Sequence, residues 1–182
     1  MSFCLIILAG GNSHRFKSNL SKAYQKIAGK SLIEINVYKA RQFKQIKKII
    51  IVYNKKDSKR IKSLKLKNVR LISGGRNRQE STYYALKHLI NKKNISKVLI
   101  HDAARPNFSL KLFNTIIKKM KNSRAVVPKI KIHDAVKQII DSSKNEYILG
   151  KKRDNLFLTQ TPQAFILKEI YQLHKTNSSK YK

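Results

Sequence analysis

Residues 97–106 read Lys-Val-Leu-Ile-His-Asp-Ala-Ala-Arg-Pro, and this stretch decides the fold more than any other part of the chain. Residues 98–100 form a short apolar run, as expected of a strand buried in a parallel sheet. Asp102 and Arg105 then follow the carboxyl end of the strand, where open α/β sheets bind their ligands. Such a corner can hold a metal ion or a hydroxyl with its carboxylate and a phosphate with its guanidinium. Taken alone, the same two residues also fit a simple ion pair at a strand end.

Further apolar runs of strand length alternate with helical stretches on both sides of this segment. The alternation predicts crossover connections and therefore an α/β fold with a mostly parallel sheet. The expected strands are residues 3–9, 48–53, 69–73, 97–101 and 124–128, and the expected helices are residues 31–43, 80–90, 110–120 and 164–174.

The alternating pattern ends after Pro128. Two short β-like pieces, residues 135–140 and 146–149, flank a polar stretch and predict a hairpin arm over about residues 132–150 that projects from the sheet. An exposed hairpin presents unpaired strand edges, so we expect a second copy of the chain to cover it.

Length and composition indicate one globular domain. The chain has 182 residues, of which 41% are hydrophobic, enough for one core and too few for two. No apolar run is long enough for a transmembrane helix, and the first apolar run has no basic region before it. The single cysteine, Cys4, cannot form an internal disulfide. We therefore expect a cytoplasmic protein without membrane contact, with one domain over residues 1–174 and a basic, frayed tail over residues 175–182.

The charge balance is strongly basic, with 41 Lys and Arg against nine Asp and Glu and a formal net charge of +32. Such a balance suggests a nucleic-acid partner. The lysines, however, are scattered over every segment and accompany many Asn and Ile residues, a mixture that an AT-rich genome also produces. We therefore expect no specific nucleic-acid partner, and a basic RNA-binding module remains one alternative.

Two glycine pairs follow predicted strands at the same sheet edge as Asp102. After the first strand come Ala9, Gly10 and Gly11, small residues that let backbone N–H groups approach a phosphate closely. Arg15 and Lys22 follow this turn at distances from which they can turn back on a bound phosphate, although each also fits a solvated surface position.

After the third predicted strand, Gly74 and Gly75 permit a tight turn that presents Arg78 and Ser81 at the start of the next helix. A helix cap with solvated arginines explains this segment equally well on its own. Because a parallel sheet brings the three strand ends to one edge, their convergence predicts a site that binds a phosphate or a nucleotide.

In these residues the chain resembles the 2-C-methyl-D-erythritol 4-phosphate cytidylyltransferase family of the nonmevalonate isoprenoid pathway. The resemblance spans nearly the whole chain, and its most specific segments are residues 101–106 and the Gln-Thr-Pro-Gln of residues 160–163. The other matching positions are Ala9, Gly10, Gly11, Arg15, Lys22, Gly74, Gly75, Arg78, Ser81, Asp134, Lys137 and Arg153.

The resemblance implies a Rossmann-like nucleotidyltransferase sheet and transfer of CMP from CTP to methylerythritol phosphate, with release of pyrophosphate. It implies that Arg15 and Lys22 are catalytic and that Arg153 reaches the sugar phosphate in the other subunit of a homodimer. It also implies Mg²⁺ as cofactor, with Asp102 as its protein ligand. The residues that it implies for binding CTP or the sugar phosphate are Ala9, Gly10, Gly11, Gly75, Arg78, Ser81, Asp102, Ala103 and Arg105.

The residue types suit this chemistry. A phosphate oxygen is already ionised at neutral pH and needs no general base, and the sequence shows no convincing Ser-His-Asp or Cys-His set. The difficulty is that two polyanions must meet, which lysine, arginine and Mg²⁺ relieve. We expect His101 to make local structural hydrogen bonds only.

Two further alternatives remain open. A ribitol-5-phosphate cytidylyltransferase would transfer CMP to a different sugar phosphate, and a nonenzymatic remnant would bind nucleotide without turnover. The remnant is considered because the resemblance implies another helix, strand and lysine after residue 163 that we expect this chain to lack. In addition, Ala135 stands where the family has threonine.

Overall fold

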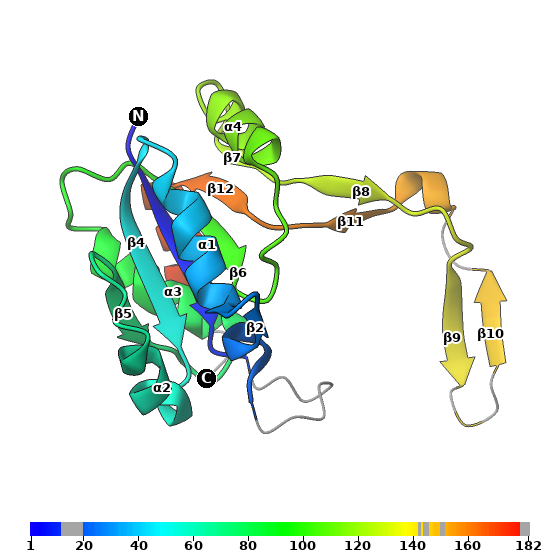
Figure 1. The fold of residues 1–182 in the computed structure, drawn as a ribbon. Coiled ribbons are helices and arrows are strands. Elements are labelled where there is room, and N and C mark those ends of the chain that lie inside the picture. Colours follow the sequence, from blue (N-terminus) through cyan, green and yellow to red (C-terminus); the bar gives the residue numbers. More distant parts are fainter. Residues whose placement is uncertain (12–19, 142, 144–145, 150–151, 179–182) are drawn as a thin grey trace.

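A computed structural model describes residues 1–11, 20–141, 143, 146–149 and 152–178. Within these ranges the centre of the molecule is a six-stranded sheet with the order β5-β4-β1-β6-β12-β7 (Figure 1). The first four strands in this order are parallel, whereas β12 is antiparallel to both of its neighbours. The prediction of a mostly parallel α/β sheet is therefore confirmed. The strands are β1 (Phe3–Ala9), β4 (Ile46–Tyr53), β5 (Arg70–Ser73), β6 (Lys97–Asp102), β7 (Ala125–Val126) and β12 (Gln163–Ile166).

Helices cover both faces of the sheet, with α1 in front of it and α3 behind it in Figure 1. Alternate residues of β1 face opposite ways, because successive side chains of a strand point to opposite faces. Leu5 and Ile7 pack in the cluster that includes α1 (Leu32–Arg41) and α4 (Leu110–Lys119), together with α2 (Ser58–Ser63). Cys4 and Ile6 pack in the cluster that includes α3 (Arg78–Leu89) and α5 (Leu167–Ser178). Burial of Cys4 raises the pKa of its thiol, as fits a small hydrophobic core residue.

The start of α1 is fixed by a reciprocal cap. The Ser31 hydroxyl accepts a hydrogen bond from the backbone N–H of Glu34, and the Glu34 carboxylate accepts one from the backbone N–H of Ser31. This capping box satisfies donors that a helix otherwise leaves unpaired at its first turn. The capping box therefore fixes the residue at which α1 begins.

The projecting arm has two parts. Next to the sheet, β8 (Lys129–Lys131) pairs antiparallel with β11 (Phe157–Thr159), and we call this ladder the stalk. Beyond it, β9 (Lys137–Asp141) pairs with β10 (Glu146–Leu149), and the short helix η3 (Arg153–Asn155) leads back to the stalk. Figure 1 shows the whole arm extending away from the sheet. The predicted hairpin is confirmed, whereas the stalk was not predicted.

Two features near the C-terminal part differ from the predictions. Residues 164–166 belong to strand β12, so the helix expected over 164–174 begins only at Leu167. It ends at Ser178, so the first four residues of the expected frayed tail are helical. Residues 179–182 lie outside the described part of the chain. The remaining short elements are η1 (Lys22–Tyr24), β2 (Lys26–Ile27), β3 (Lys30–Ser31) and η2 (Lys55–Asp57).

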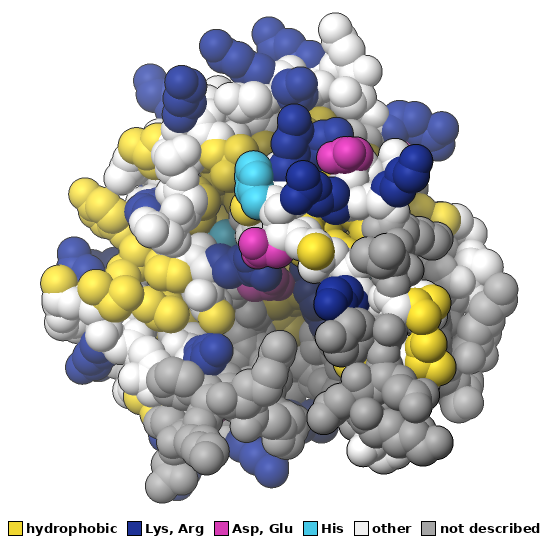
Figure 2. Space-filling view, turned by 90° about the vertical axis from the view of Figure 1, so that its right-hand side faces the viewer, with side chains coloured by type: hydrophobic (Ala, Val, Ile, Leu, Met, Phe, Trp, Pro, Cys, Tyr) yellow, Lys and Arg dark blue, Asp and Glu magenta, His cyan; other side chains and the backbone are white. Residues whose placement is uncertain are grey.

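One face of the molecule reflects the scattered charge of the sequence. In Figure 2, which looks at the side toward which the arm points, Lys and Arg side chains are spread over the face between hydrophobic ones and form no single stripe. In the described ranges, no helix combines the length and the apolar character needed to cross a membrane.

Candidate active site

The turns after β1 and β5 are both attached to the end of β4, which lies next to each strand in the sheet. The Asn54 side-chain amide, just after β4, donates a hydrogen bond to the carbonyl oxygen of Gly10 at 3.3 Å. The backbone N–H of Gly74 donates to the carbonyl oxygen of Tyr53 at 2.8 Å. The two glycine turns predicted from the sequence therefore lie at one edge of the sheet, as parallel strands require.

Ser81 sits against the second glycine turn. Its buried hydroxyl accepts a hydrogen bond from the backbone N–H of Gly75 at 3.0 Å. A Cβ atom on Gly74 would lie 2.9 Å from the Ser81 Oγ atom and 3.2 Å from the carbonyl oxygen of Tyr53. Only glycine fits at position 74 without displacing these neighbours, so the turn packs closely against both β4 and α3.

Glu80 closes the same turn from α3. Its carboxylate accepts hydrogen bonds from the backbone N–H of Arg76 at 2.7 Å and from the Tyr84 hydroxyl at 2.8 Å. These hydrogen bonds hold the pKa of the Glu80 carboxyl below its ordinary value, and the bond from the Arg76 backbone contributes most to this effect. A surface hollow of about 420 Å³ lies beside the turn, and Asn54 and Gly75 are among its lining residues. Glu80 was not among the predicted site residues, although its spacing from Asn77 is that of a helix N-terminus.

Asp102 and two arginines form the centre of the site. The Arg78 guanidinium, from the first residue of α3, lies 3.2 Å from Asp102 Oδ1. On the other side, the Nε atom of Arg105 lies 3.4 Å from Asp102 Oδ2. Arg105 also donates a hydrogen bond to the side-chain oxygen of Gln160. Since one carboxylate balances two guanidinium groups, this corner retains net positive charge and is suited to an anionic ligand.

A single copy of the chain brings together only some of the site residues that the sequence predicts. Most of the predicted binding residues lie on the turns and at the helix start just described, namely Ala9, Gly10, Gly11, Gly75, Arg78, Ser81, Asp102, Ala103 and Arg105. Lys22 is exposed at the start of η1, whose next two residues are buried in the core. In Figure 1 the neighbouring strand β2 lies at the end of the sheet toward which β4 points.

Two predicted catalytic residues are not placed at this corner. Arg15 lies outside the described residues. Arg153 is exposed at the far end of the stalk, where its guanidinium donates to the carbonyl oxygen of His133 at 2.7 Å. Figure 1 shows this part of the arm well away from the sheet edge.

A buried polar network lies directly beneath the corner. His101 is fully buried, and its Nδ1 atom accepts a hydrogen bond from the Thr161 hydroxyl at 3.0 Å. Its Nε2–H group donates to the carbonyl oxygen of Arg105 at 2.9 Å and to the side-chain oxygen of Asn36 at 3.1 Å. The bond to Arg105 is local, as expected, whereas the bonds to Asn36 and Thr161 join His101 to distant parts of the chain and were not predicted. Burial is the main cause that lowers its pKa to about 4, so the ring is neutral at pH 7.

Sequence reasoning missed Asn36 in this network. Asn36 is fully buried on the same face of α1 as Ile33, Val37 and Ala40. The apolar pattern over residues 31–43 fits a one-sided helix only loosely because this polar residue interrupts it. A polar side chain at a position of the buried face was the available signal.

Glycine turns, arginines and a carboxylate thus meet at the carboxyl edge of a mostly parallel sheet, an arrangement typical of the class of α/β proteins that bind phosphates or nucleotides. Comparison with known proteins narrows this class. The chain belongs to the 2-C-methyl-D-erythritol 4-phosphate cytidylyltransferase (IspD) family, whose sequence profile matches residues 3–181.

Individual relatives agree with the family assignment. The bifunctional enzyme IspD/IspF of Pelagibacter ubique is 46% identical over 178 residues, which are 98% of this chain and 47% of that protein. This chain thus spans about half of that relative. The crystal structure of 4-diphosphocytidyl-2C-methyl-D-erythritol synthase from Anaerococcus prevotii superposes with a TM-score of 0.81 at 32% identity, covering 100% of this chain and 77% of that one.

A relative with a different printed activity is also similar. The bifunctional ribulose 5-phosphate reductase/CDP-ribitol pyrophosphorylase Bcs1 of Haemophilus influenzae is 34% identical over 177 residues. These residues are 93% of this chain and 37% of that protein.

Proposed function

We propose that this protein transfers CMP from CTP to 2-C-methyl-D-erythritol 4-phosphate, forming 4-diphosphocytidyl-2-C-methyl-D-erythritol and pyrophosphate. A phosphate oxygen of the sugar phosphate attacks the α-phosphorus of CTP, and the bond from that phosphorus to the bridging oxygen of the β-phosphate breaks. The observation that carries the proposal is the Arg78–Asp102–Arg105 corner beside two glycine turns, in a chain of this family. The attacking oxygen is already ionised, so no proton has to be removed before attack.

The residues divide the work by charge. The glycine turns and Ser81 would hold the nucleotide, because the turns lie at the carboxyl edge of the sheet and the Ser81 hydroxyl, which accepts from Gly75, can still donate its own proton. Arg15 and Lys22 would bind its phosphates and stabilise the charge that moves onto pyrophosphate. Asp102 and Arg105 would hold the sugar phosphate, the first at a hydroxyl and the second at the phosphate.

The site also fits the Mg²⁺ ion that the family resemblance implies. The described residues contain no cluster of three acidic, His or Cys side chains for a metal. Mg²⁺, however, is commonly bound by one or two carboxylates, water and the phosphates of a substrate. Asp102 is partly exposed at the corner and would supply that carboxylate. When bound, the ion would neutralise phosphate charge.

A homodimer would complete the site, with Arg153 of one copy reaching the sugar phosphate held by the other. The arm carries exposed apolar side chains that water would otherwise surround, namely Ile130, Ile139, Ile140, Ile148, Phe157 and Leu158. Burial of such side chains is a main driving force of association. We also propose a cytoplasmic location, which suits a chain whose single cysteine, Cys4, is buried and free.

The direct test is pyrophosphate release from CTP with methylerythritol phosphate and Mg²⁺. We expect the wild-type chain to release pyrophosphate and Lys22→Ala to be slower by about a hundred-fold, as for loss of one charge-stabilising donor in other sites. Lys26→Ala, which removes another exposed lysine nearby, serves as the matched control and should retain the wild-type rate. Equal rates for wild type and Lys22→Ala would remove Lys22 from the mechanism.

Ribitol 5-phosphate is the second candidate acceptor, favoured by the similarity to the CDP-ribitol pyrophosphorylase of Haemophilus influenzae. The two acceptors should be compared by kcat/KM under the same conditions. A higher value for methylerythritol phosphate supports the proposed reaction, and a higher value for ribitol 5-phosphate replaces it. Binding of CTP without pyrophosphate release from either acceptor would identify a nonenzymatic nucleotide-binding protein.

A further inference from the structure

The segment after β6, residues 103–108, has carbonyl groups that are held mainly by side chains. Two of its backbone N–H groups bond to backbone oxygens, Ala103 to Leu8 and Arg105 to Asp102, each at 3.0 Å. We call this segment the corner loop, because Asp102 immediately precedes it and Arg105 lies within it. It belongs to no helix or strand, so its carbonyl groups have no regular backbone partners. Four of them instead accept hydrogen bonds from side chains: Ala103 from Asn36 at 2.8 Å, Arg105 from His101 at 2.9 Å, and Pro106 and Phe108 from Lys39 at 2.7 and 3.2 Å.

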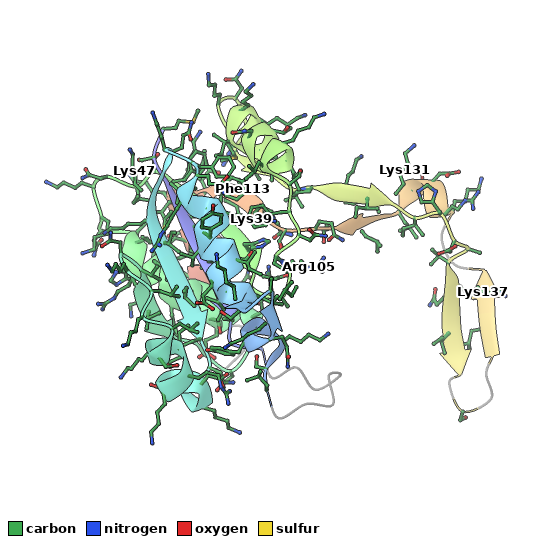
Figure 3. All side chains as sticks on the ribbon, viewed as in Figure 1. Lys39, Lys47, Arg105, Phe113, Lys131 and Lys137 are labelled. Carbon is green, nitrogen blue, oxygen red and sulfur yellow. The ribbon has the colours of Figure 1, made fainter. Side chains whose placement is uncertain are left out.

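Three of these four bonds come from α1. Asn36 and Lys39 are three residues apart and therefore lie on one face of the helix. The amide nitrogen of Asn36 also donates to the carbonyl oxygen of Leu32 at 2.8 Å, so it bonds both to its own helix and to the corner loop. The ammonium of Lys39 additionally lies 5.1 Å from the centre of the Phe108 ring. Figure 3 labels Lys39 on α1 and Arg105 in the corner loop.

We propose that Asn36 and Lys39 are positioning residues for the transfer reaction: they place Asp102 and Arg105 by holding the corner loop against α1. The inference rests on the proposed function, because it concerns the acceptor side of that site. Neither residue touches the reacting atoms.

The physical basis is the difference between the two halves of the site. The glycine turns that would hold CTP are fixed at the end of β4, the first by the Asn54 side chain and the second by a backbone bond to Tyr53 and by Ser81. The corner loop, in contrast, is tied to the sheet only at its start, by the Ala103 N–H and by His101, and the rest of it depends on an ammonium and a buried amide of α1. Hydrogen bonds from a charged donor are roughly twice as strong as neutral ones, so loss of Lys39 should loosen the loop more than its exposure suggests. The acceptor half should therefore respond to α1, and the CTP half should not.

Replacement of Lys39 tests this directly. Lys39→Met keeps the length of the side chain and removes the donor, Lys39→Gln shortens it, and Lys39→Arg restores a charged donor. Lys44→Met is the matched control, because Lys44 is exposed just beyond α1. We expect the Met and Gln variants to lower kcat/KM for the sugar phosphate by roughly tenfold, since a misplaced site residue is costly. The KM for CTP should stay within about twofold.

Hydrogen exchange of the backbone amides provides a readout that does not depend on activity. Peptides covering residues 103–108 should exchange faster in Lys39→Met than in wild type, whereas those covering β1 and β4 should not. Lys39→Arg should restore both exchange and kinetics, and Lys44→Met should change neither.

The outcomes separate the two proposals. An inactive wild-type protein overturns the proposed function, and the exchange experiment still decides whether Lys39 holds the loop. Unchanged exchange and unchanged sugar-phosphate kinetics in Lys39→Met overturn the positioning role. An equal rise of KM for CTP and for the sugar phosphate would overturn it too, because that pattern indicates a general loss of structure.

Discussion

His101 supports the corner loop from within the sheet, and its neighbours determine its protonation. Asp102 donates its backbone N–H to the Thr161 hydroxyl at 3.3 Å, so that hydroxyl is left to donate its proton to Nδ1 of His101. The Nε2–H group then faces two oxygen acceptors. A second proton on the ring would face the Thr161 hydroxyl in a buried setting, which explains why burial dominates its lowered pKa.

The neutral ring makes stability depend on pH. The pKa of His101 is lowered from 6.5 to about 4 in the folded chain, so between these values the unfolded chain binds a proton that the folded chain refuses. Stability from this group is complete above pH 6.5 and falls as pH drops toward 4, by at most about 1.4 kcal/mol per pH unit. Urea unfolding at several pH values should show a steeper decline for wild type than for His101→Gln.

The exposed His133 provides the control, because its side chain is not buried. His133→Gln should retain the wild-type decline across the same pH range. Identical slopes for wild type and His101→Gln would mean that the buried imidazole does not contribute to the acid sensitivity.

At the scale of elements, the parallel half of the sheet could be read from the sequence and the antiparallel half could not. Strands β1, β4, β5 and β6 are apolar runs followed by turns, and each matches its prediction within two residues. Strand β12 was predicted as the start of a helix, because residues 163–178 carry no turn signal between β12 and α5. Its pairing with β6 is a tertiary contact, which local pattern does not encode.

The residues of the candidate site likewise divide into those that local sequence predicts and those that depend on distant contacts. The glycine turns, Arg78, Asp102 and Arg105 were found because each follows a strand end. Asn36 and Lys39 were missed because they act from the middle of a helix on a loop more than sixty residues later in the chain. Nothing in the spacing of a single helix reports such a partner.

The second glycine turn gives a prediction about packing between elements. Gly74→Ala should destabilise the protein by about 1–3 kcal/mol, the usual cost of adding a methyl group where there is no room, because its Cβ would press on Ser81 and on β4. Gly11→Ala is the control, since no described residue other than its chain neighbours comes within 4 Å of the added Cβ. Thermal unfolding of both variants checks the prediction, and equal losses would contradict it.

At the scale of the whole molecule, the positive charge is dispersed and the exposed apolar side chains of the arm are concentrated. The excess of 32 positive charges is scattered along the sequence and over the face drawn in Figure 2, and such an excess favours the approach of anionic molecules. The arm, in contrast, concentrates exposed apolar side chains on a narrow projection. A projection of this kind has little core of its own, and association with a second copy would bury it.

From the exposed apolar side chains of the arm we predict that the protein is a dimer in solution. Light scattering after gel filtration should give twice the chain mass of 21.1 kDa. Ile139→Asp should shift the protein toward the monomer, because Ile139 is 68% exposed on β9 and a charge would be costly at a buried interface. Leu173→Asp changes a similarly exposed residue on α5 and should leave the dimer intact.

Complementation then tests whether the dimer shares its site. Lys22→Ala and Arg153→Ala should each be nearly inactive, and a mixture allowed to exchange subunits should regain part of the wild-type activity. The gain arises because one of the two sites in a mixed dimer has both residues. A mixture no more active than its components would place Arg153 outside the reaction.

The position of β12 in the sheet has a consequence for biosynthesis. β12 lies between β6 and β7, although both of those strands precede it in the chain and the arm separates it from them. On the described residues, β7 pairs only with β12. A nascent chain emerging from the ribosome can assemble β1, β4, β5 and β6 early, but β7 has no partner until residue 166 has been made. During that interval the edge of β6 is open, so chaperone capture of stalled chains should be greatest between the synthesis of β6 and that of β12.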